Sequence, residues 1–164
     1  MSDQSDQLAG VDFAVAAFHD GEDWTVEELA DDVLSDVGAL AHALRRFPGE
    51  GGAFAMVGVD EDFFLIVRTE GTSTHVLLSD ITAASEWELA ASALEHLALP
   101  MPEDEDDQEP AGDLAILADL GVSAVDLGIL LDDFDLYPDE LLSEVARKAG
   151  FGMLFDDAVG LTTA

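Results

Sequence analysis

Three apolar runs that follow one another closely constrain the fold of this chain more than any other feature. They are AFAMVGV at 53–59, FFLIVRT at 63–69 and THVLLS at 74–79, and only the polar turns DED and EGTS separate them. Short runs rich in aliphatic and aromatic residues, bounded by polar turns, are typical of strands. Connections this short join antiparallel neighbours. The segment 53–79 therefore predicts three consecutive antiparallel strands.

Two further strands and two helices are expected around these three. The apolar run VDFAVAAF at 11–18 predicts a buried strand, and a second, shorter strand is expected at 24–26. The apolar residues of 36–47 follow helical spacing after a capping-type residue, and a proline with several glycines ends that helix. Helical spacing returns from residue 80 and continues to Pro100.

The resulting order is strand, strand, helix, three strands, helix. This order resembles the longin or profilin-like arrangement, an α+β fold in which an antiparallel sheet of about five strands carries two helices. The likeness concerns the order of elements only, so it carries no function.

A change of composition divides the chain. The stretch PMPEDEDDQEPAG at 100–112 combines prolines with a run of acids, which is typical of an extended linker. Beyond it, Gly121, Pro138 and Gly150 punctuate short helical patterns. We therefore predict an α+β sheet domain at 1–99, an acidic proline-rich linker at 100–112 and a small all-helical C-terminal region at 113–164.

The helix that begins at Pro138 has the clearest signals in the chain. Proline suits a first helical turn, and Asp139 and Glu140 beside it favour the positive end of the helix dipole. Arg147 and Lys148 favour the negative end, just before a glycine.

The charge of the chain restricts its partners. It has 37 acidic and 5 basic residues, a net charge of −32, yet 49% of its residues are apolar. The apolar content predicts a folded chain despite the charge. So strong a negative charge repels phosphate backbones and excludes ordinary direct nucleic-acid binding through Lys and Arg. It favours a protein partner with a basic surface.

The sequence lacks the patterns that common catalytic and metal sites need. It has no cysteine, which excludes a disulfide, a thiolate nucleophile and a zinc site of cysteine type. No serine lies in a GxSxG or SxxK motif, and no histidine lies in an HExxH or HxE pattern. We therefore expect a protein that is not an enzyme and holds no cofactor or metal. The four histidines are interpreted as surface or half-buried side chains: His19, His42, His75 and His96.

Two acidic clusters are the candidate partner-binding residues. One is the turn between two predicted strands, and the other lies between two predicted helices. Neither matches the calcium-binding loop of an EF-hand. Ordinary turn tips and solvated helix ends explain them more simply than a metal site does in so acidic a chain, and we expect no specific metal there. The residues are Asp60, Glu61, Asp62, Asp132, Asp133 and Asp135.

Arg68 is conspicuous because cations are so rare here. In one interpretation it anchors an anion or a carboxylate of a partner. In the other it pairs with one of the chain's own acids on the surface. We favour the second, because exposed ion pairs need no special cause.

Several segments together resemble a known family. THVLLSDITAA, the acidic linker, GDLAILADLGVSAVDL and above all PDELLSEVARKAGF are similar to the actinobacterial tRNA adenosine deaminase-associated proteins. The resemblance covers most of the chain and is most specific from Gly112 to Phe151. It implies a tRNA adenosine deaminase as the candidate partner. The chain is not itself the deaminase, because a zinc deaminase needs a PCxxC element and no cysteine is present.

The charge, the missing motifs and the family resemblance leave three possible functions of different classes. In the first, the chain is a non-catalytic, cytoplasmic accessory or regulatory protein whose acids contact the basic tRNA-binding surface of the deaminase. In the second, it is a small-ligand sensor or cryptic enzyme with a pocket between the sheet and the C-terminal helices. A third is an acidic mimic of nucleic acid. No apolar run is long enough for a membrane helix, so no membrane partner is expected.

Overall fold

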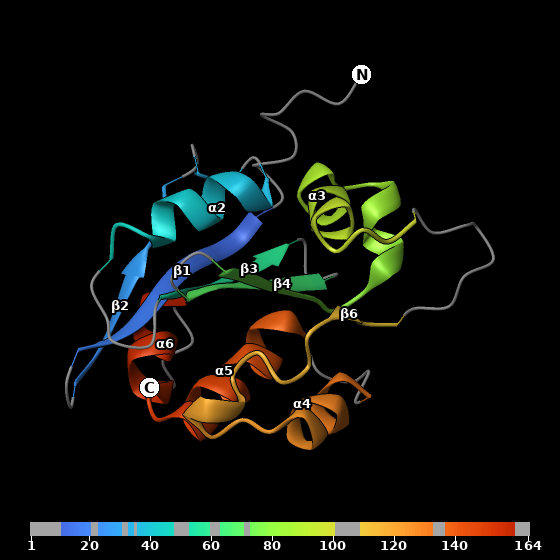
Figure 1. Cartoon of the computed structure of the whole chain (residues 1–164). Helices are drawn as coiled ribbons and strands as arrows, with labels where there is room; N and C mark the ends of the chain where they lie inside the picture. The colour runs from blue at the N-terminus through green and yellow to red at the C-terminus, as the bar shows by residue number, and fades with distance from the viewer. Residues whose placement is uncertain are drawn as a thin grey trace.

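One antiparallel sheet runs through the centre of the molecule (Figure 1). The computed structural model describes residues 11–20, 23–30, 33–34, 36–47, 53–59, 63–70, 73–100, 109–132 and 137–159. The predicted α+β class and the order ββαβββ are confirmed. The strands are β1 (Val11–Asp20), β2 (Asp23–Glu28), β3 (Phe54–Val59), β4 (Phe63–Glu70), β5 (Ser73–Leu78) and β6 (Ala111–Gly112), arranged in the sheet as β2-β1-β3-β4-β5-β6.

The three apolar runs pair as the sequence predicts. β3 pairs with β4 and β4 with β5, both antiparallel, so that Phe54, Arg68 and His75 stand side by side across the sheet. β2 and β3 flank β1 on opposite sides, and both are antiparallel to it. They are therefore parallel to each other, and the connection between them crosses β1 and contains helix α2 (Val37–Leu44).

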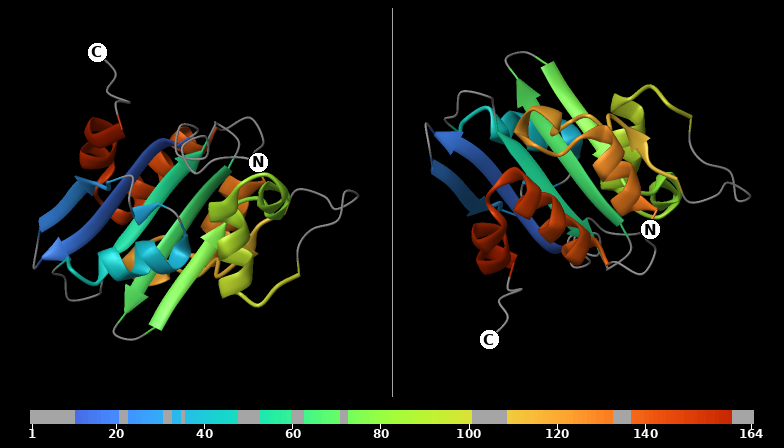
Figure 2. Two further views of the ribbon diagram at one scale, coloured as in Figure 1. Left: turned by 90° about the horizontal axis from the view of Figure 1, so that it is seen from above. Right: turned by 90° about the horizontal axis from the view of Figure 1, so that it is seen from below.

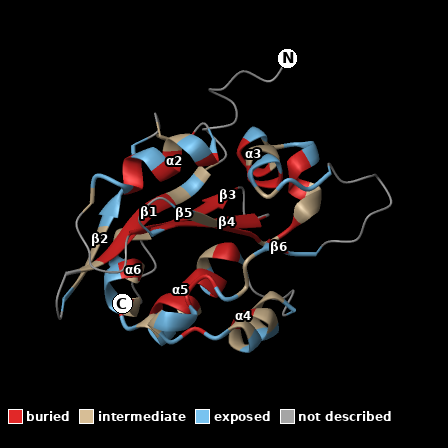
Figure 3. Ribbon diagram, viewed as in Figure 1, coloured by how far each residue is buried: buried red, intermediate tan, exposed pale blue. Residues whose placement is uncertain are grey.

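Helices cover both faces of the sheet. α2 and α3 (Glu88–His96) lie on one face, and α4 (Ala124–Leu131), α5 (Pro138–Ala149) and α6 (Gly152–Val159) lie on the other (Figure 2). All of β3 and the first seven residues of β4 are buried as a result (Figure 3). Strands buried on both faces read as continuous apolar runs, which explains why these two do not alternate with polar residues.

Alternate side chains of the central strands supply two separate cores. Ala55, Val57, Leu65 and Val67 pack toward α2 and α3. The residues between them, such as Phe54, Met56, Phe64 and Ile66, pack toward the C-terminal helices. Because side chains alternate between the two faces of a strand, a register shift of one residue would exchange the two sets.

An aromatic contact joins the C-terminal helices to the sheet. The ring of Phe151, between α5 and α6, lies with its centroid 4.6 Å from that of Trp24 and 5.7 Å from that of Phe54. Phe151 is 2% exposed. Aromatic pairs of this kind are worth about 0.5–1.5 kcal/mol beyond the area they bury. None of the described helices is long and apolar enough to cross a membrane.

The helix expected from residue 80 is divided into two. A 3₁₀ turn, η2 (Ile81–Ser85), precedes α3, and Trp87 between them has an extended backbone with φ −120° and ψ 124°. Asp80 explains the 3₁₀ turn, because its carboxylate accepts hydrogen bonds from the backbone N–H and the hydroxyl of Thr82 at 2.9 and 2.6 Å. The break places the Trp87 ring 6.2 Å from that of Phe63.

The last residues of the predicted linker belong to the sheet. Ala111 and Gly112 form β6 and stand opposite Leu78 and Leu77. The short helix expected just after the linker is a series of turns that ends in a second 3₁₀ turn, η3 (Ala118–Leu120). The division of the chain into three regions stays a prediction.

Gly112 is expected to tolerate no side chain. Its φ is +112°, and a Cβ there would lie 2.1 Å from the carbonyl oxygen of Val76. We expect Gly112→Ala to lower the free energy of unfolding by about 1–3 kcal/mol, measured by urea denaturation, because strain and backbone overlap act together. Gly128 in α4 is a matched control with open space at its Cβ, so Gly128→Ala should raise stability by up to about 1 kcal/mol. Equal effects of the two substitutions would contradict this account.

Candidate functional site

The basic residues gather at one end of the sheet. This end is marked by Phe54, Arg68 and His75, where β3 and β5 begin and β4 ends. We call it the mixed-charge end, because acids occur there as well. All five Lys and Arg residues of the chain and all four histidines belong to it, as the following contacts show: His19, His42, Arg45, Arg46, Arg68, His75, His96, Arg147 and Lys148.

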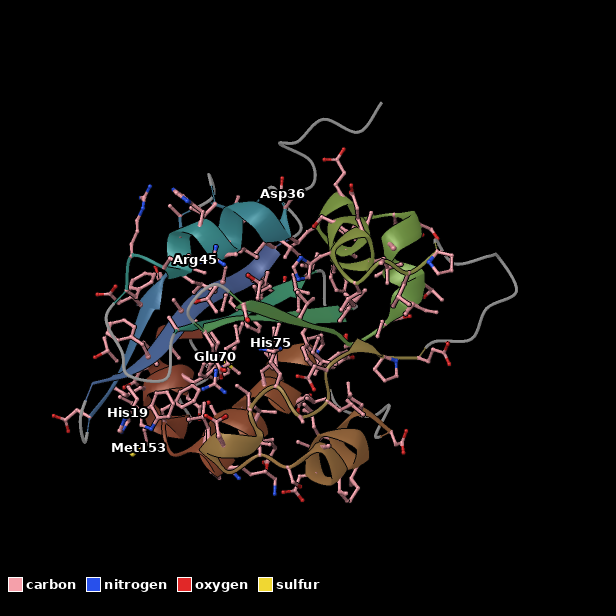
Figure 4. All side chains as sticks on the ribbon, viewed as in Figure 1. His19, Asp36, Arg45, Glu70, His75 and Met153 are labelled. Carbon is pink, nitrogen blue, oxygen red and sulfur yellow. The ribbon has the colours of Figure 1, made fainter. Side chains whose placement is uncertain are left out.

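Four of these residues come from the ends of α2 and α3. Nη2 of Arg45 donates to the hydroxyl of Thr74 at 2.9 Å, and Nε2 of His96 lies 3.1 Å from the Thr74 carbonyl oxygen. Nη2 of Arg46 lies 3.5 Å from Nε2 of His42. Both helices therefore end beside the first residues of β5. Figure 4 shows Arg45 at one end of α2 and Asp36 at the other.

Three more of these residues come from α5 and from the β1–β2 hairpin. The C-cap of α5 is Gly150, whose φ is +108°, and a Cβ at this glycine would lie 3.5 Å from Nε1 of Trp24. Arg147 and Lys148 occupy the last turn of α5, just before it. The imidazole of His19 lies 5.0 Å from the Trp24 indole, measured between ring centroids.

Helix dipoles account for the helical members of this cluster. α2, α3 and α5 all end at the mixed-charge end, and each carries a basic residue or a histidine in its last turn. The C-terminus of a helix carries partial negative charge, so a cation there contributes about 0.3–1 kcal/mol. Stability is therefore sufficient to explain the positions of these helical residues, whereas His19, Arg68 and His75 lie on strands. The consequence is that the rest of the surface has no basic residue.

The opposite end of the sheet is acidic. It is where β1 begins at Val11 beside Val59, and Val59 in turn faces Phe63. Trp87 packs on Phe63, so the acidic start of α3 also lies here. We call this the acid-only end, because every basic residue and histidine of the chain lies at the other one.

Arg68 is paired within the chain, as expected, but the expected exposure was wrong. It is 1% exposed, and its Nη1 donates to the Ile116 carbonyl oxygen at 2.8 Å and to Oδ1 of Asp119. Its Nη2 donates to Oδ2 of Asp119 at 2.9 Å and lies 3.5 Å from Oε1 of Glu70. The two-pronged geometry is the strongest that Arg and a carboxylate form. Side chains two residues apart in a strand point to the same face, so Arg68 points inward like the buried Ile66. This signal was available in the sequence.

The pair perturbs one carboxyl group. Hydrogen bonds from Arg68 lower the pKa of Asp119 below its ordinary value, and partial burial opposes them. The Asp119 side chain is itself 59% exposed, so solvent weakens the interaction. Nearby, Nδ1 of His75 lies 3.6 Å from Oδ2 of Asp113. Together, the Arg68–Asp119 and His75–Asp113 pairs hold the residues after β6 against β4 and β5.

Of the six acids proposed from the sequence, the structure describes one. Asp132 is exposed and ends α4. The other five candidate residues lie outside the described part of the chain: Asp60, Glu61, Asp62, Asp133 and Asp135. Among the residues that the structure does describe, no three or more His, Asp or Glu side chains come together in a way that would hold a metal ion.

Sequence reasoning missed a groove at the acid-only end. It has a volume of about 490 Å³ and lies between the start of β1, the end of β2 and α6. Among the described residues, its lining includes Asp12, Glu28 and Asp157 and no Lys, Arg or His. Only the tertiary packing of α6 beside β1 joins residues so far apart in the chain, so no local pattern predicts the groove.

Comparison with known proteins identifies the family. The family model described as "Rv3753c-like tRNA adenosine deaminase-associated protein" matches residues 12–152. The chain belongs to this family. A relative, "Protein Rv3753c" of Mycobacterium tuberculosis (strain ATCC 25618 / H37Rv), is 38% identical over 142 residues, which cover 85% of this chain and 82% of the relative. No solved structure matches. The resemblance to the deaminase-associated proteins is thus confirmed.

A double-mutant cycle should show how far Arg68 and Asp119 depend on each other. We expect Asp119→Ala to lower the free energy of unfolding by about 1–3 kcal/mol, because the buried Arg68 loses two hydrogen bonds. Arg68→Met with Asp119→Ala should cost less than the sum of the single changes. Strict additivity in urea denaturation would show that the pair is uncoupled.

The same pair should make stability depend on acid pH. Because the pKa of Asp119 is lowered in the folded state, the folded protein binds the proton less readily than the unfolded chain does. The stability from Asp119 is then present above the ordinary carboxyl pKa, about 3.9, and is lost as pH falls through the lower folded value. The difference in unfolding free energy between wild type and Asp119→Asn should shrink across this range. A difference that stays constant from pH 7 into this acid range would refute the assignment.

Proposed function

We propose that this member of the deaminase-associated family is a non-catalytic accessory or regulatory protein that binds a partner with a basic surface. The partner proposed is the tRNA adenosine deaminase that the family's name mentions. The expected cytoplasmic location is part of this proposal.

The segregation of charge is the observation that carries the proposal. The chain has a net charge of −32, and its few basic residues sit at one end of the sheet. The remaining surface can approach a basic partner without repulsion from any cation of its own. Complementary charge of this kind speeds association and selects partners more than it adds affinity.

The role of Arg68 supports binding over a ligand-sensing pocket. A pocket in which an Arg or His converges with several acids would favour the sensor. Arg68 is instead engaged by Asp119 and the Ile116 carbonyl group, where it fastens two parts of the chain. The described residues that line the groove at the acid-only end are acids and apolar residues, without Arg or His.

Binding of the purified pair should depend strongly on salt. We expect a complex with the deaminase in size-exclusion chromatography and calorimetry at about 50 mM salt, weakened at least about tenfold at about 500 mM, because salt screens surface charges. Adding tRNA should displace the chain if both use the basic surface of the enzyme. An unrelated acidic protein of similar charge is the control for non-specific attraction.

Two results would overturn the proposal. One is the lack of any complex at low salt. The other is equal binding by the acidic control protein, because the association would then reflect charge alone. The rate of tRNA deamination with and without the chain would show whether the bound chain activates or inhibits the enzyme.

A further inference from the structure

Helix α4 is apolar on a side that the fold leaves open. Apart from Asp126 its residues are apolar or glycine, yet Leu127 alone is buried. Figure 3 shows α4 mostly in tan and pale blue, whereas the central strands are red. A helix that is apolar all round normally lies inside a core. α4 therefore exposes apolar surface that the packing of this chain does not use.

The exposed apolar side chains of α4 are neighbours. Val125 is 71% exposed and Ile129 is 63% exposed. Residues three or four apart lie on the same side of a helix, so these two are one turn apart. Asp132, the exposed C-cap residue, follows three residues later on the same side. Apolar side chains exposed singly are ordinary, but contiguous ones are typical of interaction sites. We call Val125, Gly128, Ile129 and Asp132 the α4 face.

The glycine in this face is not required by the fold. A Cβ at Gly128 would meet no atom within 4 Å, so an alanine would fit there. Glycine is less favourable than alanine in the interior of a helix, so this position lowers the stability of α4. Glycine does allow another backbone to come close. The notch beside Val125 and Ile129 thus suits a second helix packed against α4.

The C-terminal end of α4 is negative. Its C-cap residue is Asp132 and its last turn has no basic residue, whereas α2, α3 and α5 each have Lys, Arg or His there. The last carbonyl groups of a helix carry partial negative charge, so an acid beside them is unfavourable and a cation is favourable. A second copy of this chain would bring another Asp132 and another net charge of −32, and would be repelled. The charge therefore favours a basic partner over a second copy.

We propose that the α4 face binds a helix of the protein partner that is apolar along the contact and carries Lys or Arg at its border. This inference rests on the proposed function and names the part of this chain that meets the partner. Val125 and Ile129 supply the apolar centre, Gly128 allows close approach, and Asp132 pairs with the bordering cation. An apolar centre with a polar rim is the usual anatomy of a protein interface.

Three model peptides test the face without the deaminase. The first is an end-capped peptide of leucine and lysine with leucine at helical spacing, titrated into the ¹⁵N-labelled full chain at about 50 mM salt, where surface charges are weakly screened. One control peptide has glutamate in place of lysine. The other keeps lysine and has glutamine in place of leucine, so it reports attraction by charge alone. Only the first peptide should shift the backbone amides of Val125, Gly128 and Ile129.

Two double variants separate the α4 face from general surface hydrophobicity. Val125→Gln with Ile129→Gln removes its apolar centre, and Met153→Gln with Leu154→Gln makes the matched change at exposed apolar residues of α6. We expect the first double variant to weaken the leucine–lysine peptide and the deaminase at least about tenfold, and the second less than about twofold. Circular dichroism of both variants checks that they stay folded.

Two single variants separate binding from stability. Gly128→Gln should raise the midpoint of urea denaturation, because glutamine is the better helix former, and should still weaken the peptide about fivefold by blocking close approach. Asp132→Asn should weaken the peptide about threefold at 50 mM salt and little at about 500 mM. Its matched control is Glu95→Gln, an exposed acid in the last turn of α3. If the residues of α4 had only a structural role, these changes would alter stability and leave binding as it was.

Several results would overturn this inference. They are equal losses for the two double variants, amide shifts elsewhere with none in α4, or an equal response to either control peptide. A dimer at about 500 mM salt that Val125→Gln with Ile129→Gln abolishes would identify a second copy as the occupant, since salt weakens the repulsion between copies. Shifts in α4 caused by phosphatidylcholine vesicles and not by the peptide would identify a lipid surface. A face already covered by the chain's own residues would give no shift, and would overturn it as well.

The proposed function is judged separately. If the deaminase binds the Val125→Gln, Ile129→Gln variant as well as it binds wild type, the assignment of the α4 face fails while the complex stands. If the leucine–lysine peptide binds α4 and the deaminase does not bind the chain, the proposed function fails while the face remains a site for a basic, apolar helix.

Discussion

Burial of both faces of one sheet is the constraint on which the rest of the molecule depends. The central strands β3 and β4 have almost no exposed residue, and their alternate side chains enter two cores. Neither core can form from the sheet alone, because each needs its own layer of helices. The C-terminal helices are therefore as necessary to the strands as α2 and α3 are. The contacts of Phe151 with Trp24 and Phe54, and the Arg68–Asp119 pair, are the points where that second layer is fastened.

An interior this apolar leaves the surface to carry a net charge of −32. The few cations are not spread evenly to offset it. Three helices end at the same end of the sheet, and the basic residues and histidines near their last turns accumulate there. An arrangement that favours helix stability thus creates a surface with two different ends. The groove of Asp12, Glu28 and Asp157 lies at the end without basic residues.

The sequence predicts the secondary structure of this chain better than its packing. Apolar runs separated by short turns were enough to predict the strands. Pro138 and the charges around it were enough to predict α5. The break at Trp87 was not predicted. Hydrogen bonds from Thr82 to the Asp80 side chain favour a 3₁₀ turn there, and the spacing of apolar residues does not show them. The pairing of Gly112 with Leu77 and the groove depend on contacts between distant residues. Arg68 was expected in an exposed ion pair, which needs no special cause, whereas its place in the alternation of β4 puts its side chain inside.

The common direction of α2, α3 and α5 has a consequence for how the molecule moves toward a partner. Cations at one end and only acids at the other give it a permanent electric dipole along the strands, in addition to its net charge. In the field of a large basic protein such a body experiences a torque as well as an attraction, and it turns before it touches. It would arrive with the end where β1 begins facing forward. Salt screens such a field beyond about one Debye length, roughly 8–10 Å at ordinary ionic strength, so this turning would take place only close to the surface of the partner.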